Sequence, residues 1–122
     1  MRILVVEDEK KIALFVQKGL KELGFVVDVL HQGDEAMDVI LTHHFDAIVL
    51  DVMLPGQDGL SLTRQLKADP LMASIRVVAV TAHAMVGDRQ LSLDAGCIGH
   101  ITKPFDTKAI TEQIAGFLQA SA

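Results

Sequence analysis

Five short and nearly continuous apolar runs recur along the chain, separated by segments of helical periodicity. The runs are Ile3–Val6, Phe25–Leu30, Ala47–Leu50, Val77–Val80 and Ile98–Ile101. A strand that faces solvent on one side alternates apolar and polar residues, whereas a strand of a parallel sheet covered on both faces does not. The runs therefore predict a parallel sheet enclosed between two layers of helices.

Apolar residues follow helical spacing in a further segment after each run. These segments are residues 10–23, 34–43, 59–67, 84–94 and 106–119. In the first of them one face carries Ile12, Phe15, Val16, Gly19, Leu20 and Leu23, and Gly24 follows as the expected stop. Strand–helix units joined by right-handed crossovers predict an α/β fold, a doubly wound (βα)5 three-layer sandwich. Its commonest strand order is 2-1-3-4-5, the flavodoxin-like arrangement.

Length and composition fit one domain over residues 1–122. Half of the 122 residues are hydrophobic, so a chain of this size can bury a core of its own. Its single cysteine, Cys97, excludes a disulfide framework and a cysteine-based zinc cluster. A formal net charge of −5 argues against direct binding of nucleic acid. Since no apolar segment approaches the roughly 18 residues of a membrane span, we expect a cytoplasmic protein without membrane contact.

Four of the predicted strands end in residues that can take part in chemistry. These are Glu7 and Asp8 after the first strand, Asp51 after the third, Thr81 after the fourth and Lys103 after the fifth. The second strand ends without such a group. Ligands of a doubly wound sheet bind at the carboxyl ends of the strands, where the strand order reverses. The first and third strands are neighbours at that point, so their three carboxylates are expected to meet in one pocket.

Like charges at such close range need a cation between them. Carboxylate oxygens suit Mg²⁺, with Mn²⁺ as a substitute. Three carboxylates, Lys103 and one Mg²⁺ balance to zero, so the pocket can then receive a phosphoryl group. Asp51 is central and ends a buried strand, which makes it the candidate nucleophile for an aspartyl phosphate. The Thr81 hydroxyl and the Lys103 ammonium are expected to contact the phosphoryl oxygens.

Four motifs at these strand ends resemble the receiver domain of two-component response regulators, and the resemblance covers the whole chain. They are Val5–Glu9, Leu50–Gly59, Val80–Ala82 and Lys103–Phe105. The resemblance implies a phosphoacceptor signalling switch, with a phosphoryl group passing to Asp51 from a histidine kinase or a phosphotransfer protein. It also implies that the domain is no enzyme beyond its own phosphorylation and dephosphorylation.

The same resemblance assigns roles to individual residues. It implies that Glu7, Asp8, Asp51 and the main-chain carbonyl of Met53 bind Mg²⁺. It further implies that Thr81 and Lys103 read the phosphoryl group.

One position departs from the family pattern. Receivers usually carry Tyr or Phe three residues before the lysine, as a switch coupled to the threonine, but this chain has His100 there. We therefore expect the switch formed by Thr81 and His100 to be weaker or to depend on pH.

Partners follow from the resemblance too. The fourth helix, fifth strand and fifth helix are expected to bind a downstream effector. The first helix, with the loop before the last helix, is expected to receive the kinase. The protein is expected to be a monomer or a weak dimer that depends on phosphorylation.

The two halves of the chain resemble different receivers. Residues 1–67 are most similar to receivers of winged-helix transcription regulators, and residues 75–105 to stand-alone or kinase-attached receivers. Recombination or engineering would explain this difference. The chain is either a stand-alone receiver or a part excised from a larger regulator.

The residues alone leave two other classes of protein possible. An aspartate-nucleophile phosphatase needs a second acid two residues after the nucleophile, where this chain has Met53. A phosphorylation-independent interaction module would keep the fold without the chemistry. Such modules usually lack part of the acidic pair, the acceptor or the lysine, and this chain has them all.

Overall fold

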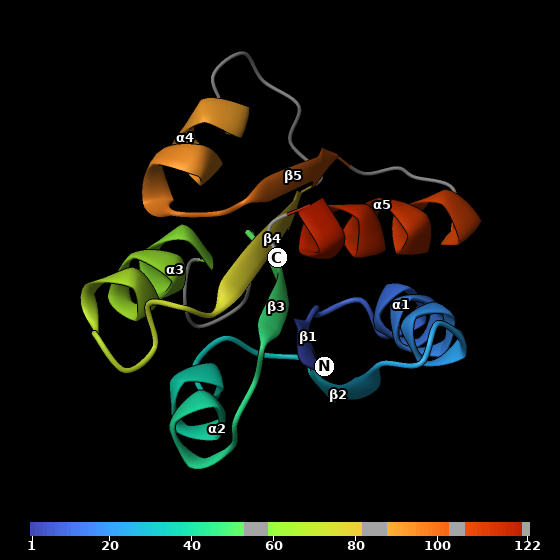
Figure 1. The fold of residues 1–122 in the computed structure, drawn as a ribbon, viewed down its shortest axis with the longest axis horizontal. Coiled ribbons are helices and arrows are strands. Elements are labelled where there is room, and N and C mark those ends of the chain that lie inside the picture. The colour runs from blue at the N-terminus through green and yellow to red at the C-terminus, as the bar shows by residue number, and fades with distance from the viewer. Residues whose placement is uncertain (53–58, 82–87, 103–106, 121–122) are drawn as a thin grey trace.

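A computed structural model describes residues 1–52, 59–81, 88–102 and 107–120. The elements along the chain are β1 (Arg2–Val6), α1 (Lys10–Glu22), β2 (Val26–Leu30), α2 (Ala36–Thr42), β3 (Ala47–Asp51), α3 (Gly59–Ala68), β4 (Arg76–Thr81), α4 (Asp88–Ala95), β5 (Gly99–Thr102) and α5 (Thr107–Ala120). Each predicted apolar run and each predicted helical segment corresponds to one of these elements (Figure 1). The predicted order of strands and helices is therefore confirmed.

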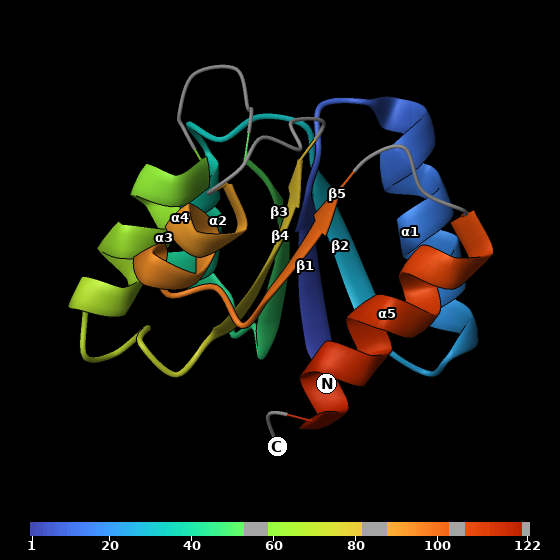
Figure 2. The ribbon, with the colours of Figure 1, turned by 90° about the horizontal axis from the view of Figure 1, so that it is seen from above.

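The strands form one parallel sheet in the order β2-β1-β3-β4-β5. Helices α1 and α5 cover one face, and α2, α3 and α4 cover the other (Figure 2). This is the predicted flavodoxin-like three-layer sandwich. All strands run in the same direction, so their carboxyl ends meet at a single edge.

Alternate residues of the central strands supply two separate cores. On the face covered by α2, α3 and α4, the buried cluster includes Leu4, Ile48 and Leu50. On the opposite face, the cluster includes Ile3, Val5 and Val49. Since both faces of β1, β3 and β4 are buried, their sequences show the continuous apolar runs from which the sheet was predicted.

Glycine ends two of the helices with the same motif. After α1, Gly24 has a φ of 95° and its N–H donates to the Lys21 carbonyl, while the Phe25 N–H donates to the Leu20 carbonyl. After α4, Gly96 has a φ of 112° and makes the corresponding bond. Glycine adopts this left-handed conformation without steric cost, so the predicted stop at Gly24 is confirmed.

The prediction of which residues of α1 face the core was only partly right. Val16 and Leu20 are buried as expected, but Phe15 is 50% and Leu23 52% exposed, and Ala13 is buried instead. Helix α1 lies close to α5 at Gly19, where a Cβ atom would collide with the Thr111 side chain. Phe15 and Leu23 border an open hollow beside this contact and therefore remain half in solvent.

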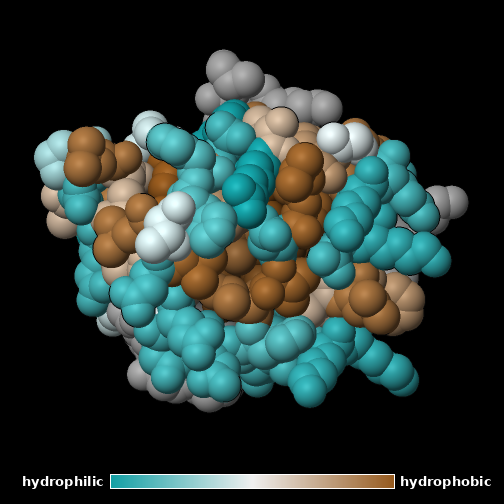
Figure 3. Space-filling model, turned by 90° about the horizontal axis from the view of Figure 1, so that it is seen from below, coloured by the Kyte–Doolittle hydropathy of each residue, from teal (hydrophilic) through white to brown (hydrophobic). Residues whose placement is uncertain are grey.

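Strand β2 forms an apolar outer edge of the sheet. Val26 is 60% exposed on this strand, and a view from below shows an apolar area in the middle of this side of the molecule (Figure 3). The charged pair of Asp28 and Arg2 interrupts the edge, with 2.8 Å between Asp28 Oδ2 and Arg2 Nε.

Candidate functional site

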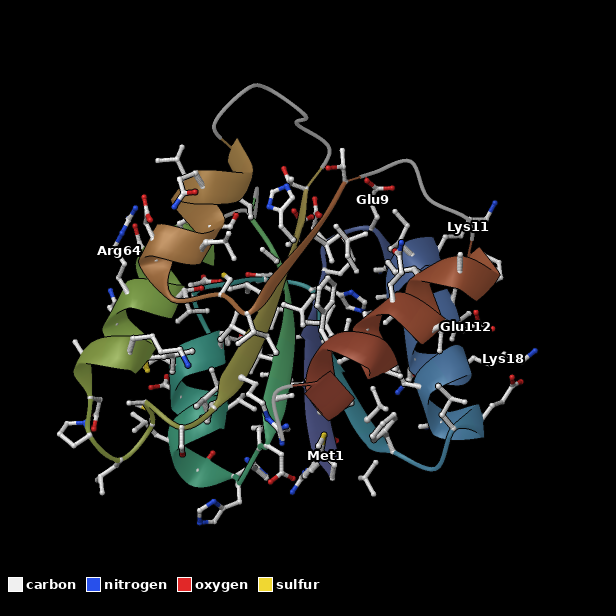
Figure 4. The ribbon with its side chains drawn as sticks, turned by 45° about the horizontal axis from the view of Figure 1, so that its top comes forward. Met1, Glu9, Lys11, Lys18, Arg64 and Glu112 are labelled. Carbon is white, nitrogen blue, oxygen red and sulfur yellow. The ribbon has the colours of Figure 1, made fainter. Side chains whose placement is uncertain are left out.

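The strand register places the predicted acidic residues next to one another at the carboxyl edge of the sheet. Val6 of β1 lies beside Leu50 of β3, so the next residues, Glu7 and Asp51, follow side by side at the edge of the sheet. Glu7 and Asp51 are each only 4% exposed, whereas Asp8 lies in solvent. Glu9 marks the same edge in Figure 4, where the chain passes from β1 into α1.

The three carboxylates form one cluster. Glu7, Asp8 and Asp51 each offer an oxygen, and these oxygens lie within 4.8 Å of one another. Oxygens on opposite sides of a bound Mg²⁺ are roughly 4.2 Å apart, which is twice the Mg–O bond length. The hardness of the donors therefore fits Mg²⁺, and binding would draw the three oxygens closer together, since at most one pair of them can lie on opposite sides of the ion.

Backbone and side-chain hydrogen bonds hold the turn that carries the acidic pair. The Glu7 N–H donates to the Leu30 carbonyl over 2.9 Å, which extends the ladder between β1 and β2 by one bond. The Glu9 N–H donates to Glu7 Oε2 over 3.1 Å. On the other side, His31 Nδ1 lies 3.0 Å from the Glu7 carbonyl oxygen. His31 follows β2, which lies outside the point where the strand order reverses, so its part in this turn could not be predicted from the sequence.

Thr81 lies near Asp51 on the neighbouring strand. It ends β4, is 2% exposed and follows Val80, the register partner of Asp51. The Val52 N–H donates to the Val80 carbonyl over 2.9 Å, which ties the end of β3 to the end of β4. Thr81 is therefore placed at the edge where the sequence predicts it. Lys103 and Met53 lie outside the described residues.

A glycine permits the close approach of α3 to the end of β3. A Cβ atom at Gly59 would lie 2.6 Å from the main-chain oxygen of Asp51 and 2.9 Å from the Val52 Cα. Both contacts are shorter than real Cβ atoms show, so the first turn of α3 can rest against Asp51 only without a side chain.

His100 connects β5 to α4. Its Nδ1 shares a hydrogen bond of 2.9 Å with the hydroxyl of Ser92, a buried residue of α4. The residue at the family's switch position thus contacts the helix that is expected to respond to phosphorylation. The buried position of Ser92 was not predicted, because serine carries no apolar signal.

Cys97 and Lys67 lie on the α3–α4 side of the sheet, away from the acidic edge. Burial raises the pKa of the Cys97 thiol, and the contact with the Thr63 hydroxyl at 3.9 Å opposes this only in part. Burial also lowers the pKa of the Lys67 ammonium, which donates to the carbonyls of Ala73 and Ile75. Neither group adds to the acidic site.

Within the described ranges, every helix is too short or too polar to cross a membrane.

The fold and the site together define a flavodoxin-like α/β protein with an acidic cluster at the carboxyl edge of its sheet, where the strand order reverses. The family model of the response regulator receiver domain matches residues 3–115. The chain belongs to this family, as the sequence motifs predict.

Similar proteins agree with this assignment. The transcriptional activator protein IrlR of Burkholderia pseudomallei is 38% identical over 119 residues, which make up 98% of this chain and 51% of that protein. The transcriptional regulatory protein DltR of Streptococcus agalactiae is 39% identical over 114 residues, or 93% of this chain and 50% of that protein. The chain thus spans about half the length of these curated relatives.

A solved structure of a similar protein shows the same fold. The receiver domain of the Francisella response regulator 1452 is 29% identical, with a TM-score of 0.87. The comparison covers 99% of this chain and 98% of that one.

Proposed function

We propose that this receiver domain is a phosphoacceptor switch of a two-component system, with Asp51 as the acceptor. The observation that carries this proposal is the cluster of Glu7, Asp8 and Asp51, whose oxygens lie within 4.8 Å of one another. Asp51 is its best acceptor because it ends the central strand β3, which is buried along its whole length. Glu7 and Asp8 then serve as the metal-binding pair, together with Asp51 and the Met53 carbonyl.

The chemistry is an in-line phosphoryl transfer. A carboxylate oxygen of Asp51 attacks phosphorus, so an O–P bond forms while the N–P bond of a donor phosphohistidine breaks, and the leaving imidazole takes up a proton. Mg²⁺, or Mn²⁺ in its place, would supply positive charge for the phosphoryl oxygens. The Thr81 hydroxyl donates to one of these oxygens, and Lys103 is proposed to contact another.

Switching follows from the place of Thr81 between Asp51 and β5. Movement of Thr81 toward the phosphoryl group would change the packing at β5 and α4, which the bond between His100 and Ser92 joins. The surface of α4, β5 and α5 is therefore proposed to bind the downstream effector. Whether the switch at His100 is weakened or depends on pH stays a prediction.

The donor kinase is proposed to dock on α1. Lys11 and Lys18 point away from the sheet on this helix (Figure 4), and Leu14 and Phe15 are 64% and 50% exposed beside them. Exposed apolar side chains among cations suit a partner that has an apolar surface with acidic groups around it. The loop before α5, the other part of the predicted docking site, lies outside the described residues.

We propose that the domain acts in the cytoplasm, alone or as the input half of a longer regulator, as a monomer or a weak dimer that depends on phosphorylation. We also propose that it turns over no substrate other than its own phosphoryl group.

Mass spectrometry after treatment with acetyl phosphate and Mg²⁺ tests the acceptor. The parent protein should gain the mass of one phosphoryl group, and Asp51→Asn should gain none, because an amide cannot attack phosphorus in this way. Asp94→Asn, an exposed position on α4, serves as the matched control and should be labelled like the parent. Labelling of Asp51→Asn to the level of the parent would exclude Asp51 as the acceptor.

A further inference from the structure

The sheet ladder between β1 and β2 continues past the last residue of β2 through a side chain. The two strands pair from Arg2 with Val26 to Val6 with Leu30, and the Glu7 N–H adds one more bond to the Leu30 carbonyl. In a continued parallel ladder the Glu7 carbonyl would next accept from the backbone amide two residues after Leu30. Here a side chain takes the place of that backbone amide: His31 Nδ1 lies 3.0 Å from the Glu7 carbonyl oxygen.

The proton of this hydrogen bond can be assigned. A carbonyl oxygen only accepts, so the ring nitrogen Nδ1 of His31 must carry the hydrogen and donate it. His31 thus acts as a directional donor, and an aliphatic or phenyl side chain could not replace it.

The bond fixes the peptide unit that joins the two acidic residues. The Glu7 carbonyl belongs to the same planar group as the Asp8 nitrogen, so holding its oxygen sets the direction in which Asp8 leaves the turn. The other end of Glu7 is held as well, through its N–H and through Oε2, which accepts from the Glu9 N–H. Glu7 is buried and Asp8 lies in solvent, and the peptide unit that His31 holds is the link between the two residues.

We propose that His31 is a positioning residue for the Glu7–Asp8 pair and thereby raises the affinity of the acidic cluster for Mg²⁺. This inference rests on the proposed function, since it takes the cluster to be the metal site. Groups that orient a metal ligand through hydrogen bonds typically change metal affinity by about 10–100-fold when they are removed. Since His31 acts on a ligand through the backbone, we expect an effect near the lower figure.

Isothermal titration of the full chain with Mg²⁺ tests the proposal. Calorimetry is suitable because the chain contains no Trp and no Tyr to report binding by fluorescence. His31→Ala and His31→Phe both remove the donor, and each should weaken Mg²⁺ binding about tenfold. His31→Asn places an amide nitrogen at the same branch of the side chain as Nδ1, so it should recover most of the affinity. His44→Ala, which removes an exposed histidine elsewhere, should bind Mg²⁺ like the parent.

The outcomes separate positioning from a merely structural link. Equal Mg²⁺ affinity in the parent and in His31→Ala would overturn the proposal, as would a His31→Asn variant as weak as His31→Ala. Urea unfolding without metal shows whether a variant is simply less stable. If His31→Ala fails to fold, the comparison of His31→Phe with His31→Asn still decides. A different result would contradict the proposed function, namely a parent protein that takes up no phosphoryl group on Asp51.

Discussion

Cys97 is a buried thiol whose environment opposes ionisation. It is 5% exposed, and burial raises its pKa. The thiolate is the form that reacts with disulfide reagents, so both the low accessibility and the raised pKa protect this residue.

We therefore expect slow labelling of Cys97 in the folded protein. At the same pH, reaction with an aromatic disulfide reagent should be on the order of a hundredfold slower than in the urea-unfolded chain, because it requires local opening. Absorbance of the released thiol measures the rate, and Cys97→Ser supplies the blank. Equal rates in the folded and unfolded protein would show that the thiol is accessible.

At the scale of single residues, the sequence predicted the acidic cluster but missed the group that supports it. Glu7, Asp8 and Asp51 could be found because each follows a recognisable apolar run. The contact of His31 with the Glu7 carbonyl depends on how the chain turns after β2, and no periodicity encodes that path. The predicted roles of Met53 in binding the metal and of Lys103 in contacting the phosphoryl group remain predictions.

Among the elements, α3 depends on a glycine for its position. Gly59→Ala would place a Cβ atom 2.6 Å from the backbone oxygen of Asp51, and backbone atoms cannot rotate away. We expect a loss of about 1–3 kcal/mol in the free energy of unfolding, as for other overpacked sites. Urea unfolding measures the change.

Gly116 of α5 is the matched control for this substitution. Apart from its chain neighbours and the backbone of its own helix, a Cβ atom there meets no heavy atom of the described residues within 4 Å, so Gly116→Ala adds helix propensity without a clash. It should raise the free energy of unfolding by about 0.4–1 kcal/mol. Similar effects of the two substitutions would contradict the steric explanation for Gly59.

The positions of helices and strands along the chain were easier to predict than the side of a helix that faces the core. The strands were predictable because β1, β3 and β4 are buried on both sides and therefore apolar throughout. The prediction of the inward face of α1 was partly wrong, because Phe15 and Leu23 have the right spacing but border an open hollow beside α5. How closely α1 approaches α5 depends on Gly19 and Thr111, which lie far apart in the sequence.

At the scale of the whole molecule, Asp28 is expected to keep the edge strand β2 from pairing with another copy. Edge strands that are apolar and uninterrupted by charge promote edge-to-edge association. Asp28→Val should leave the fold intact, because an exposed ion pair such as that with Arg2 contributes only about 0.2–1 kcal/mol. In sedimentation experiments, the average mass of the Asp28→Val variant should exceed that of the parent and should rise with protein concentration.

Asp94→Val controls for the change in net charge. It removes the same charge from an exposed position of α4, away from β2, and should sediment like the parent. If both variants associate equally, net charge rather than the edge of β2 explains the effect.

The three-layer architecture was predictable as a whole because alternating apolar runs and helical segments leave few ways to cover a parallel sheet. The separation of its interior into two clusters, one on each face, has a consequence for redesign. Neighbouring residues such as Leu50 and Val49 belong to different clusters. Changes on opposite faces share few partners and should combine almost additively. An engineer could therefore rebuild one side of the interior while the other keeps the strands, and with them the acidic edge, in register.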